Sequence, residues 1–295
     1  YKCFDFVSKL LVFLFKFIIK VIAVFLVLAG VVGLITLFTV ILGGPFNMSI
    51  NNQTIDAFWM NNVSDLFFTS GYMYTIGIIG VSLLTIIPLL GILYGGVRIL
   101  FDIPKTNKAI GLSAASLWVI GLIFVIIAAS NTANEYSSKQ KISENVVVEG
   151  LSSDTLTLSS MAGTYSTSKY DSDEVFIEED YIFTNDFSVD VVQGKAAEVV
   201  LIVDKTARGS NRRESGKRAE NIELNYEVND NELSMSPFIQ FPVEDKYRNQ
   251  DVQISIALPI GMSIYLEESS RDIIYEIKNV TTTYDGKMMG HHWLM

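Results

Sequence analysis

The sequence predicts a membrane region of α-helices followed by an all-β domain. Three apolar segments of at least 21 residues contain no Asp, Glu, Lys, Arg or His, and about 20 such residues in a helix cross a bilayer core of about 30 Å. The two halves differ in charge, since residues 1–130 carry seven Lys and Arg against four Asp and Glu, whereas residues 131–295 carry 15 against 28. After the third segment the apolar periodicity changes to two, which is typical of β-strands.

The predicted membrane region covers residues 21–130 and contains three spans. The spans are residues 21–42, 72–97 and 109–129. Basic residues flank them in two groups, Lys2, Lys9, Lys16 and Lys20 before the first span and Arg98, Lys105 and Lys108 between the second and the third. The loop between the first two spans has no Lys or Arg. Because short cytoplasmic loops are enriched in Lys and Arg, we expect a bacterial inner-membrane protein with a cytoplasmic N-terminus and a periplasmic C-terminal domain.

Residues 1–20 are predicted to form an amphipathic basic helix before the first span. Lys2, Lys9, Lys16 and Lys20 recur at helical spacing, and most of the other residues are Phe, Leu, Val and Ile. One interpretation is a contact with the anionic surface of the membrane or with a partner. The other is an extension of the first span whose lysines extend to the interface and set the topology.

The second span has features of close helix packing. Pro88 lies near its middle, and Gly91 and Gly95 form a small-xxx-small pattern. Proline tends to kink a helix, and such glycines let helices approach closely. We expect packing among the spans of one chain, with a homo-oligomer as the alternative. The lack of charged residues inside the spans argues against ion-coupled transport.

The exposed half begins with a polar stretch, residues 131–144, which we interpret as a linker to a β-domain at residues 145–295. Short apolar segments separated by Asn, Asp, Gly and Ser predict the strands of this domain. They are residues 146–148, 156–158, 175–177, 199–203, 222–226, 233–235, 254–258, 264–266 and 273–277. Their spacing is compatible with a sandwich and with a β-solenoid-like stack.

A basic stretch at residues 205–218 stands out in this acidic half. Its predicted anion contacts are Arg208, Arg212, Arg213, Lys217 and Arg218. Such a patch would suit a lipid phosphate or a cell-wall polymer. The alternative, which we favour, is a solvated crossover between two strands that is partly helical through Glu220, because runs of charge usually face solvent.

Neither catalysis nor a cofactor is predicted. The chain has one cysteine, Cys3, and two histidines, His291 and His292, so it cannot form an internal disulfide or a Cys/His zinc site by itself. It contains no G-x-S-x-G, H-E-x-x-H, P-loop or dinucleotide-binding motif, which argues against the common enzyme classes. The acidic exposed half also argues against nucleic-acid binding.

Several segments resemble the Bacteroidetes-type phage shock protein C (PspC) family. In the membrane region they are residues 91–101, 108–112 and 117–121. In the exposed half they are residues 207–209, 219–222, 246–250 and 258–261, together with the ending at residues 290–295. The resemblance covers most of the chain, and it implies that a small PspC domain lies ahead of Tyr1.

This resemblance implies a non-enzymatic inner-membrane protein of the envelope-stress response. Its exposed part would be a toastrack β-domain, similar to those of LiaF and LiaG, which favours the solenoid-like arrangement. The family offers no catalytic residues to carry over. The expected function is a stress sensor or regulatory scaffold whose partners are the lipid bilayer and other membrane or cytoplasmic stress-response proteins. The alternative is a structural or accessory subunit that uses the β-domain as an interaction module.

Overall fold

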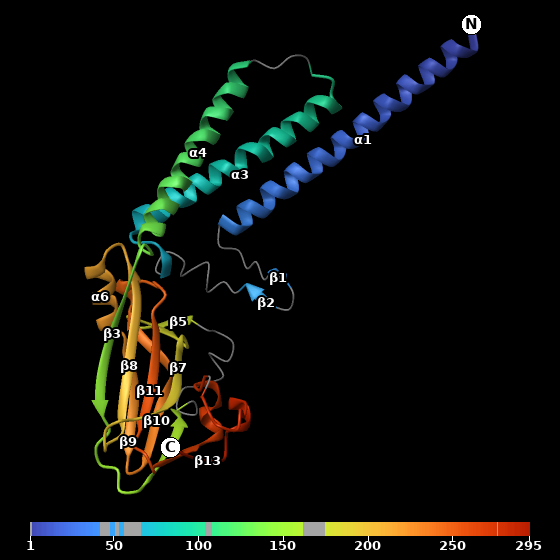
Figure 1. The fold of residues 1–295 in the computed structure, drawn as a ribbon. Helices are drawn as coiled ribbons and strands as arrows, with labels where there is room; N and C mark the ends of the chain where they lie inside the picture. The colour runs from blue at the N-terminus through green and yellow to red at the C-terminus, as the bar shows by residue number, and fades with distance from the viewer. Residues whose placement is uncertain are drawn as a thin grey trace. The chain divides into compact units, whose positions relative to one another are not determined.

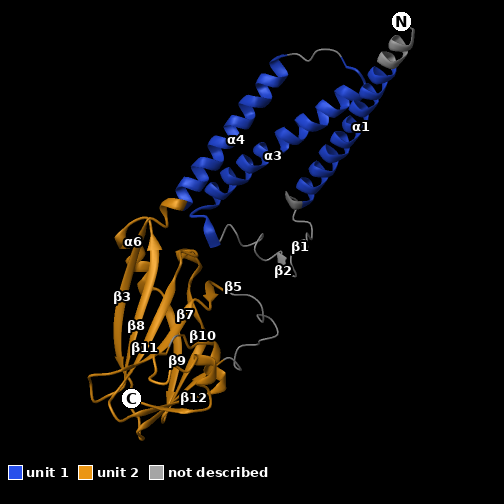
Figure 2. Ribbon diagram, turned by 45° about the vertical axis from the view of Figure 1, so that its right-hand side comes forward, with its two compact units in different colours: residues 1–132 blue, residues 133–295 orange. Residues whose placement is uncertain are grey.

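The computed structural model describes residues 2–41, 48–50, 53–55, 66–103, 108–161, 175–275 and 277–295. The chain divides into two compact units, Tyr1–Thr132 and Ala133–Met295, which Figure 2 shows in different colours. The first unit is built of helices and the second mainly of strands. The order of a helical membrane region and an all-β domain is therefore as the sequence predicts.

Three helices of the first unit are long and apolar enough to cross a membrane. They are α1 (Lys2–Ile41), α3 (Gly71–Leu100) and α4 (Lys108–Asn134) (Figure 1). Between α1 and α3, the short strands β1 (Met48–Ile50) and β2 (Gln53–Ile55) pair in antiparallel orientation. Because α1 is continuous over 40 residues, the predicted basic helix and the first predicted span are two parts of one helix.

Glycines let the helices of this unit approach each other closely. A Cβ atom on Gly96 of α3 would lie 3.0 Å from the backbone oxygen of Ala23 in α1. A Cβ atom on Gly80 of α3 would lie 2.9 Å from the backbone oxygen of Gly121 in α4. Small residues at such crossings allow the close van der Waals packing that holds helices together in lipid.

The second unit contains eleven described strands in two sheets. They are β3 (Ser138–Val147), β4 (Thr155–Ser160), β5 (Val175–Glu178), β6 (Tyr181–Thr184), β7 (Phe187–Gln193), β8 (Val200–Gly209), β9 (Glu223–Asn229), β10 (Glu232–Pro242), β11 (Asp251–Leu258), β12 (Ser263–Leu266) and β13 (His292–Leu294). One sheet has the order β3-β8-β11-β7. The other has the order β13-β12-β4-β10-β6-β5, with β9 also paired to β10.

The two sheets enclose one apolar core. Leu158 of β4 and Ile264 of β12 belong to the same buried cluster as Val189 of β7, Leu201 of β8 and Ile254 of β11. Because successive side chains of a strand point to opposite faces, each sheet contributes alternate residues to this core. Parallel pairing of β4 with β10 and β12, and of β7 with β11, shows that the chain crosses over between neighbouring strands.

One predicted strand is wrong. The described residues of the range 273–277 form no continuous ladder, and Ile274 makes only an isolated bridge to Val189. The segment makes two backbone hydrogen bonds with Val189, one through the oxygen of Ile273 and one through the nitrogen of Tyr275. Ile273, Ile274 and Ile277 are all buried, so the apolar residues that suggested a strand serve to cover the core.

The stretch predicted as a linker is structured. Residues 131–134 complete α4, and β3 begins at Ser138. Two turns close the gap, since Tyr136 N donates to Ala133 O and Ser137 N donates to Asn134 O. The first strand of the β-domain therefore begins four residues after the end of α4.

Candidate functional site

A buried polar cluster lies where the chain enters the β-domain. Its members, which we call the entry cluster, are Glu135, Tyr136, Arg208, Arg218 and Arg248. Glu135 and Tyr136 directly follow α4, Arg208 lies near the end of β8, and Arg218 belongs to α6 (Arg212–Glu220). Arg248 lies in the loop before β11. The cluster thus joins segments up to 113 residues apart in the sequence.

Glu135 is the acceptor at the centre of this cluster. Arg218 Nη2 donates to Glu135 Oε2 at 2.6 Å, and Arg248 Nε lies 3.7 Å from the same oxygen. The side chains of Glu135 and Arg218 are each 12% exposed, and that of Arg248 is fully buried. Burial lowers the pKa of Arg248, but an arginine guanidinium keeps its proton in proteins. The arrangement is a buried ion-paired triad of two cations and one anion.

Tyr136 ties the cluster together through its ring, its hydroxyl and its backbone. The guanidinium of Arg248 lies over the ring of Tyr136, 5.2 Å from the centroid. The hydroxyl of Tyr136 donates to the backbone oxygen of Tyr247 at 2.7 Å, and Arg248 Nη1 donates to the same oxygen at 2.8 Å. Arg208 Nη1 donates to Tyr136 O at 2.9 Å. Strand β8, helix α6 and the loop before β11 are therefore all hydrogen-bonded to the first residues of the domain.

The loop that carries Arg248 has an unusual backbone. Lys246 and Asn249 adopt positive φ angles of 58° and 55°, a region that residues other than glycine occupy rarely. The side chain of Gln250 closes the loop, because its Nε2 donates to Lys246 O and its Oε1 accepts from Arg248 N. Such conformations persist only where the surrounding structure enforces them, and here they place the side chain of Arg248 in the interior.

The five predicted anion contacts divide into two groups. Arg208 and Arg218 belong to the entry cluster and donate to acceptors of the protein itself. The exposed ones are Arg212, Arg213 and Lys217 of α6. Helix α6 begins at the cap Asn211, whose side chain accepts from the nitrogens of Arg213 and Glu214. This geometry corresponds to the crossover that is helical through Glu220, and only the three exposed side chains remain candidates for an anion.

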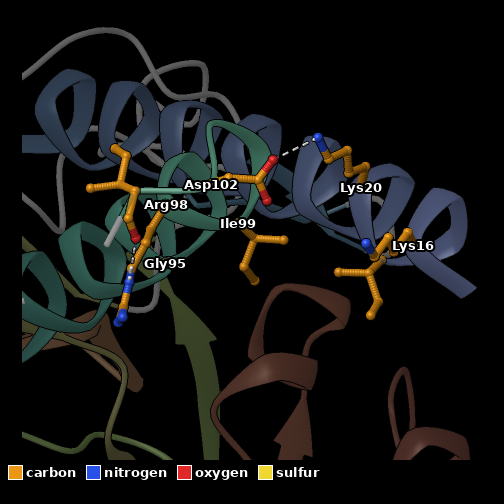
Figure 3. A pocket seen from close by; sticks show the side chains of 8 residues that line it. Lys16, Lys20, Gly95, Arg98, Ile99 and Asp102 are labelled. Atoms are coloured by element: carbon orange, nitrogen blue, oxygen red, sulfur yellow. Dashed lines mark hydrogen bonds and ion pairs between the residues drawn. The ribbon is translucent and has the colours of Figure 1, made fainter. Parts of the chain in front are cut away.

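A second candidate site is a groove in the helical unit, which we call the basic groove (Figure 3). Lys16 and Lys20 of α1 and Arg98 of α3 line it together with Asp102. Lys20 Nζ lies 3.0 Å from Asp102 Oδ2, and Arg98 Nε donates to Ile103 O at 3.3 Å. The groove has a volume of about 890 Å³. Two of the four predicted surface lysines thus line the same groove as a third cation, Arg98, which the sequence pattern assigned only to topology.

The remaining predicted residues are distributed as follows. Lys2 and Lys9 lie on α1, and their side chains are outside the described residues. Pro88 lies inside α3 and is exposed within the unit. No atom of the described residues lies within 4 Å of a Cβ atom built on Gly91 or Gly95. The close approaches between the described helices occur at other glycines, so the expected packing of Gly91 and Gly95 within one chain is not seen there, and the alternative, contact in a homo-oligomer, stays a prediction.

The described residues contain no group of three or more His, Cys, Asp or Glu that could hold a metal ion. His291 and His292 lie at the start of β13, where the Nδ1 of His291 is 2.7 Å from Met289 O. No sequence pattern points to Glu135 or Tyr136, because a lone acid in a polar stretch is typical of a linker. The segment 246–250, noted for a family resemblance, was the available signal for Arg248.

Two family models match the chain and together cover most of it. One describes the PspC transmembrane region and matches residues 1–136; the other describes a toast-rack domain found in some PspC proteins and matches residues 171–295. Both families are non-enzymatic membrane or regulatory domains.

No curated protein matches the chain. One solved structure, of a candidate adhesin from Parabacteroides merdae ATCC 43184, matches with a TM-score of 0.18 and 5% identity over 43% of this chain and 35% of that one. The chain thus covers about a third of the length of that protein, and the likeness carries no conclusion about fold or function.

Proposed function

Because the chain is a PspC-type protein with a toast-rack C-terminal domain, we propose that it is an inner-membrane sensor of envelope stress. It is a multi-pass membrane protein, and its family supports a regulatory role at the membrane. In this proposal the β-domain lies in the periplasm and binds a ligand or partner. The membrane helices pass the resulting state to cytoplasmic stress-response proteins.

The orientation is supported by the distribution of basic residues. Lys16 and Lys20 of α1 line one groove with Arg98, which lies in the last turn of α3, and Lys108 begins α4. Basic side chains at one end of the spans favour the cytoplasmic side. Because α4 is the third span, its C-terminal end and the β-domain that follows would then lie on the periplasmic side.

The observation that carries the proposed function is the entry cluster. A sensor must transmit a conformational change from its binding domain to its membrane helices, and a flexible linker between them would not transmit it. Here Glu135 follows α4 directly and is held by the fully buried Arg248 and the largely buried Arg218 of the β-domain. A rearrangement of β8, α6 or the loop 246–250 would therefore act on the first residues after the third span.

Reporter fusions test the orientation. A reporter that is active only in the periplasm should be active when fused after Met295 and inactive when inserted beside Lys105. A cytoplasmic signal from the fusion after Met295 would overturn the proposed sensor. The insertion beside Lys105 serves as the internal control for expression.

A stress-response reporter tests the coupling through the entry cluster. Glu135→Gln should reduce the induced response at unchanged protein level, because it removes the anion shared by Arg218 and Arg248. Glu268→Gln is the matched control, since Glu268 pairs with Arg271 on the surface of the same domain. Equal responses of the two variants would contradict a role of the cluster in signalling.

Exposed apolar residues of the β-domain favour a second candidate function, an accessory subunit. Tyr275, Val280 and Tyr284 lie in one segment and are 64%, 103% and 77% exposed. Apolar side chains gathered on a surface often mark contacts with other proteins. Affinity purification from cross-linked membranes separates the two functions. One stoichiometric partner in stressed and unstressed cells alike would favour the subunit, whereas stress-dependent partners would favour the sensor.

A further inference from the structure

The basic groove combines positive charge with an apolar wall. Lys16 and Lys20 are four residues apart and therefore lie on the same face of α1, and Arg98 of α3 lines the other end of the same groove (Figure 3). Asp102 is the one acid among the residues that line the groove. Three cations against one anion leave a net charge of about +2, by the unperturbed ionisation of these groups at pH 7.

Lys20 and Arg98 both keep hydrogen-bond donors that a ligand could use. The ion pair of Lys20 with Asp102 is exposed, at 50% and 78% for the two side chains, and such pairs contribute little and exchange readily. The guanidinium of Arg98 uses one N–H donor for Ile103 O, out of five that an arginine carries. This bond orients the planar group, and a fork of this kind suits the oxygens of a phosphate.

The groove lies at the level where the charge-free part of α3 ends. Residues 72–97 contain no charged side chain, and Arg98 is the first. Gly96 packs against Ala23 and Val27 of α1, so Lys20, about one turn before Ala23, lies level with the end of α3. Polar headgroups of a bilayer occupy this level when the charge-free part of α3 spans the hydrocarbon core.

Apolar side chains continue from the groove along the helices. Ile19 and Ile99 belong to its lining, and Ile22 and Val24 of α1, on the bilayer side of Lys20, are 52% and 43% exposed. A free anion gains nothing from such neighbours, whereas the acyl chains of a lipid bury them. The combination of phosphate-binding cations with an adjoining apolar surface distinguishes a lipid from a soluble phosphate.

We propose that the groove between α1 and α3 binds the headgroup of an anionic phospholipid, with Lys16 and Lys20 at one end and Arg98 at the other as the cations that attract it. The proposal deepens the proposed function, because it names a membrane component that the sensor would read on the side opposite to the β-domain. Asp102 weakens the site, since its carboxylate competes with the lipid phosphate for Lys20. A change in the anionic lipid content of the membrane would then change the fraction of chains that hold a lipid in the groove between α1 and α3.

Native mass spectrometry of the full chain in detergent tests this site, with phosphatidylglycerol and phosphatidylcholine as the two probes. The chain should retain phosphatidylglycerol in preference to phosphatidylcholine. Arg98→Gln and Lys20→Gln should each reduce phosphatidylglycerol retention about fivefold, which is the effect expected of one surface cation near an anionic lipid. An excess of inorganic phosphate should leave the lipid bound, because the free anion has no acyl chains.

Lys108→Gln is the matched control, because it removes one exposed cation at the start of α4 that does not line the groove. Retention should stay at the level of the unaltered chain in this variant. Asp102→Asn should increase phosphatidylglycerol retention, a gain that misfolding cannot produce. Equal retention of the two lipids, an equal loss in Lys108→Gln, or displacement by inorganic phosphate would overturn the proposal. The reporter fusions are independent of this measurement, so its failure would leave the proposed sensor standing.

Discussion

Arg218 of α6 donates a hydrogen bond of 2.6 Å to Glu135, the first residue after α4. The same carboxylate oxygen lies 3.7 Å from the fully buried Arg248. Two cations from the β-domain therefore depend on one anion at its entrance. Removing one partner of a buried pair leaves an uncompensated charge, which costs more than the pair itself contributes.

Glu135→Ala should lower the free energy of unfolding of the β-domain by about 3 kcal/mol, the cost typical of breaking a buried ion pair. Hydrogen exchange of peptides from β8 and β11 in the whole chain measures this change, because core strands exchange through global unfolding of their domain. Glu268→Ala is the control, since the Arg271–Glu268 pair is largely exposed and should cost less than about 1 kcal/mol. Similar losses in both variants would show that the entry cluster adds nothing to stability.

Leu201→Ala should destabilise the same domain by about 2–5 kcal/mol, the range measured for large cavities in cores. Leu201 is fully buried between the sheets. Val280→Ala changes an apolar side chain that is 103% exposed, so its effect should stay within about 0.5 kcal/mol. Chemical denaturation of the two variants compares them directly, and a loss in Val280→Ala would contradict the assigned core.

Asp251→Asn should stabilise the β-domain at neutral pH. Burial raises the pKa of Asp251 above its ordinary value of 3.8, although Lys139 opposes this. The folded domain therefore binds the proton more tightly than the unfolded chain, and this contribution is present below the ordinary value and lost as the pH rises through the raised pKa. Thermal unfolding measured from about pH 3 to about pH 7 should show that the unfolding temperature of the variant depends less on pH than that of the unaltered chain.

Asp204→Asn should destabilise the β-domain at neutral pH, which is the opposite of the effect expected of Asp251→Asn. Burial acts to raise the pKa of Asp204, but hydrogen bonds from Lys141 and Ser143 outweigh burial and hold it below 3.8. The stability that this carboxylate contributes is present above the ordinary value and lost as the pH falls through the lowered pKa. The variant should unfold more easily at neutral pH, and a stabilisation there would refute the assigned pairing.

Gly80→Ala should loosen the contact between α3 and α4. The added Cβ would meet backbone atoms of α4 at 2.9 Å, and overpacking of this kind costs about 1–3 kcal/mol. Gly91→Ala lies on the same helix with nothing within 4 Å, so it should be neutral or gain up to about 1 kcal/mol of helix propensity. Hydrogen exchange of α3 in bilayers distinguishes the two. A loss in Gly91→Ala would instead indicate a second chain packed on that face.

Most of the elements could be predicted from local patterns. The three long apolar helices lie where charge-free segments predict them, because a span is determined by its own residues and the thickness of the bilayer. Strand β11 lies where apolar residues alternate, and β8 begins in a short continuous apolar run; both patterns are typical of strands with at least one buried face. The wrong strand at residues 273–277 has the same composition but three buried isoleucines that do not alternate.

The candidate sites could be predicted only in part. The charge pattern marks residues 205–218 as one basic stretch, yet Arg218 is largely buried against Glu135 while Arg213, five residues earlier, is exposed. The difference depends on Glu135, 83 residues away, and no local pattern encodes that contact. The joining of Lys20 with Arg98 in one groove likewise depends on the antiparallel packing of α1 against α3.

The sequence by itself determined the membrane helices, the all-β class of the exposed half and the charge difference between them, because each follows from composition and periodicity within a short window. Only the tertiary structure decided which cations are available to a ligand. A charged side chain is exposed or buried according to the partner that desolvates or neutralises it, and here those partners come from distant segments. Folding therefore separated Arg208 and Arg218 from Arg212, Arg213 and Lys217, and brought Lys16, Lys20 and Arg98 together.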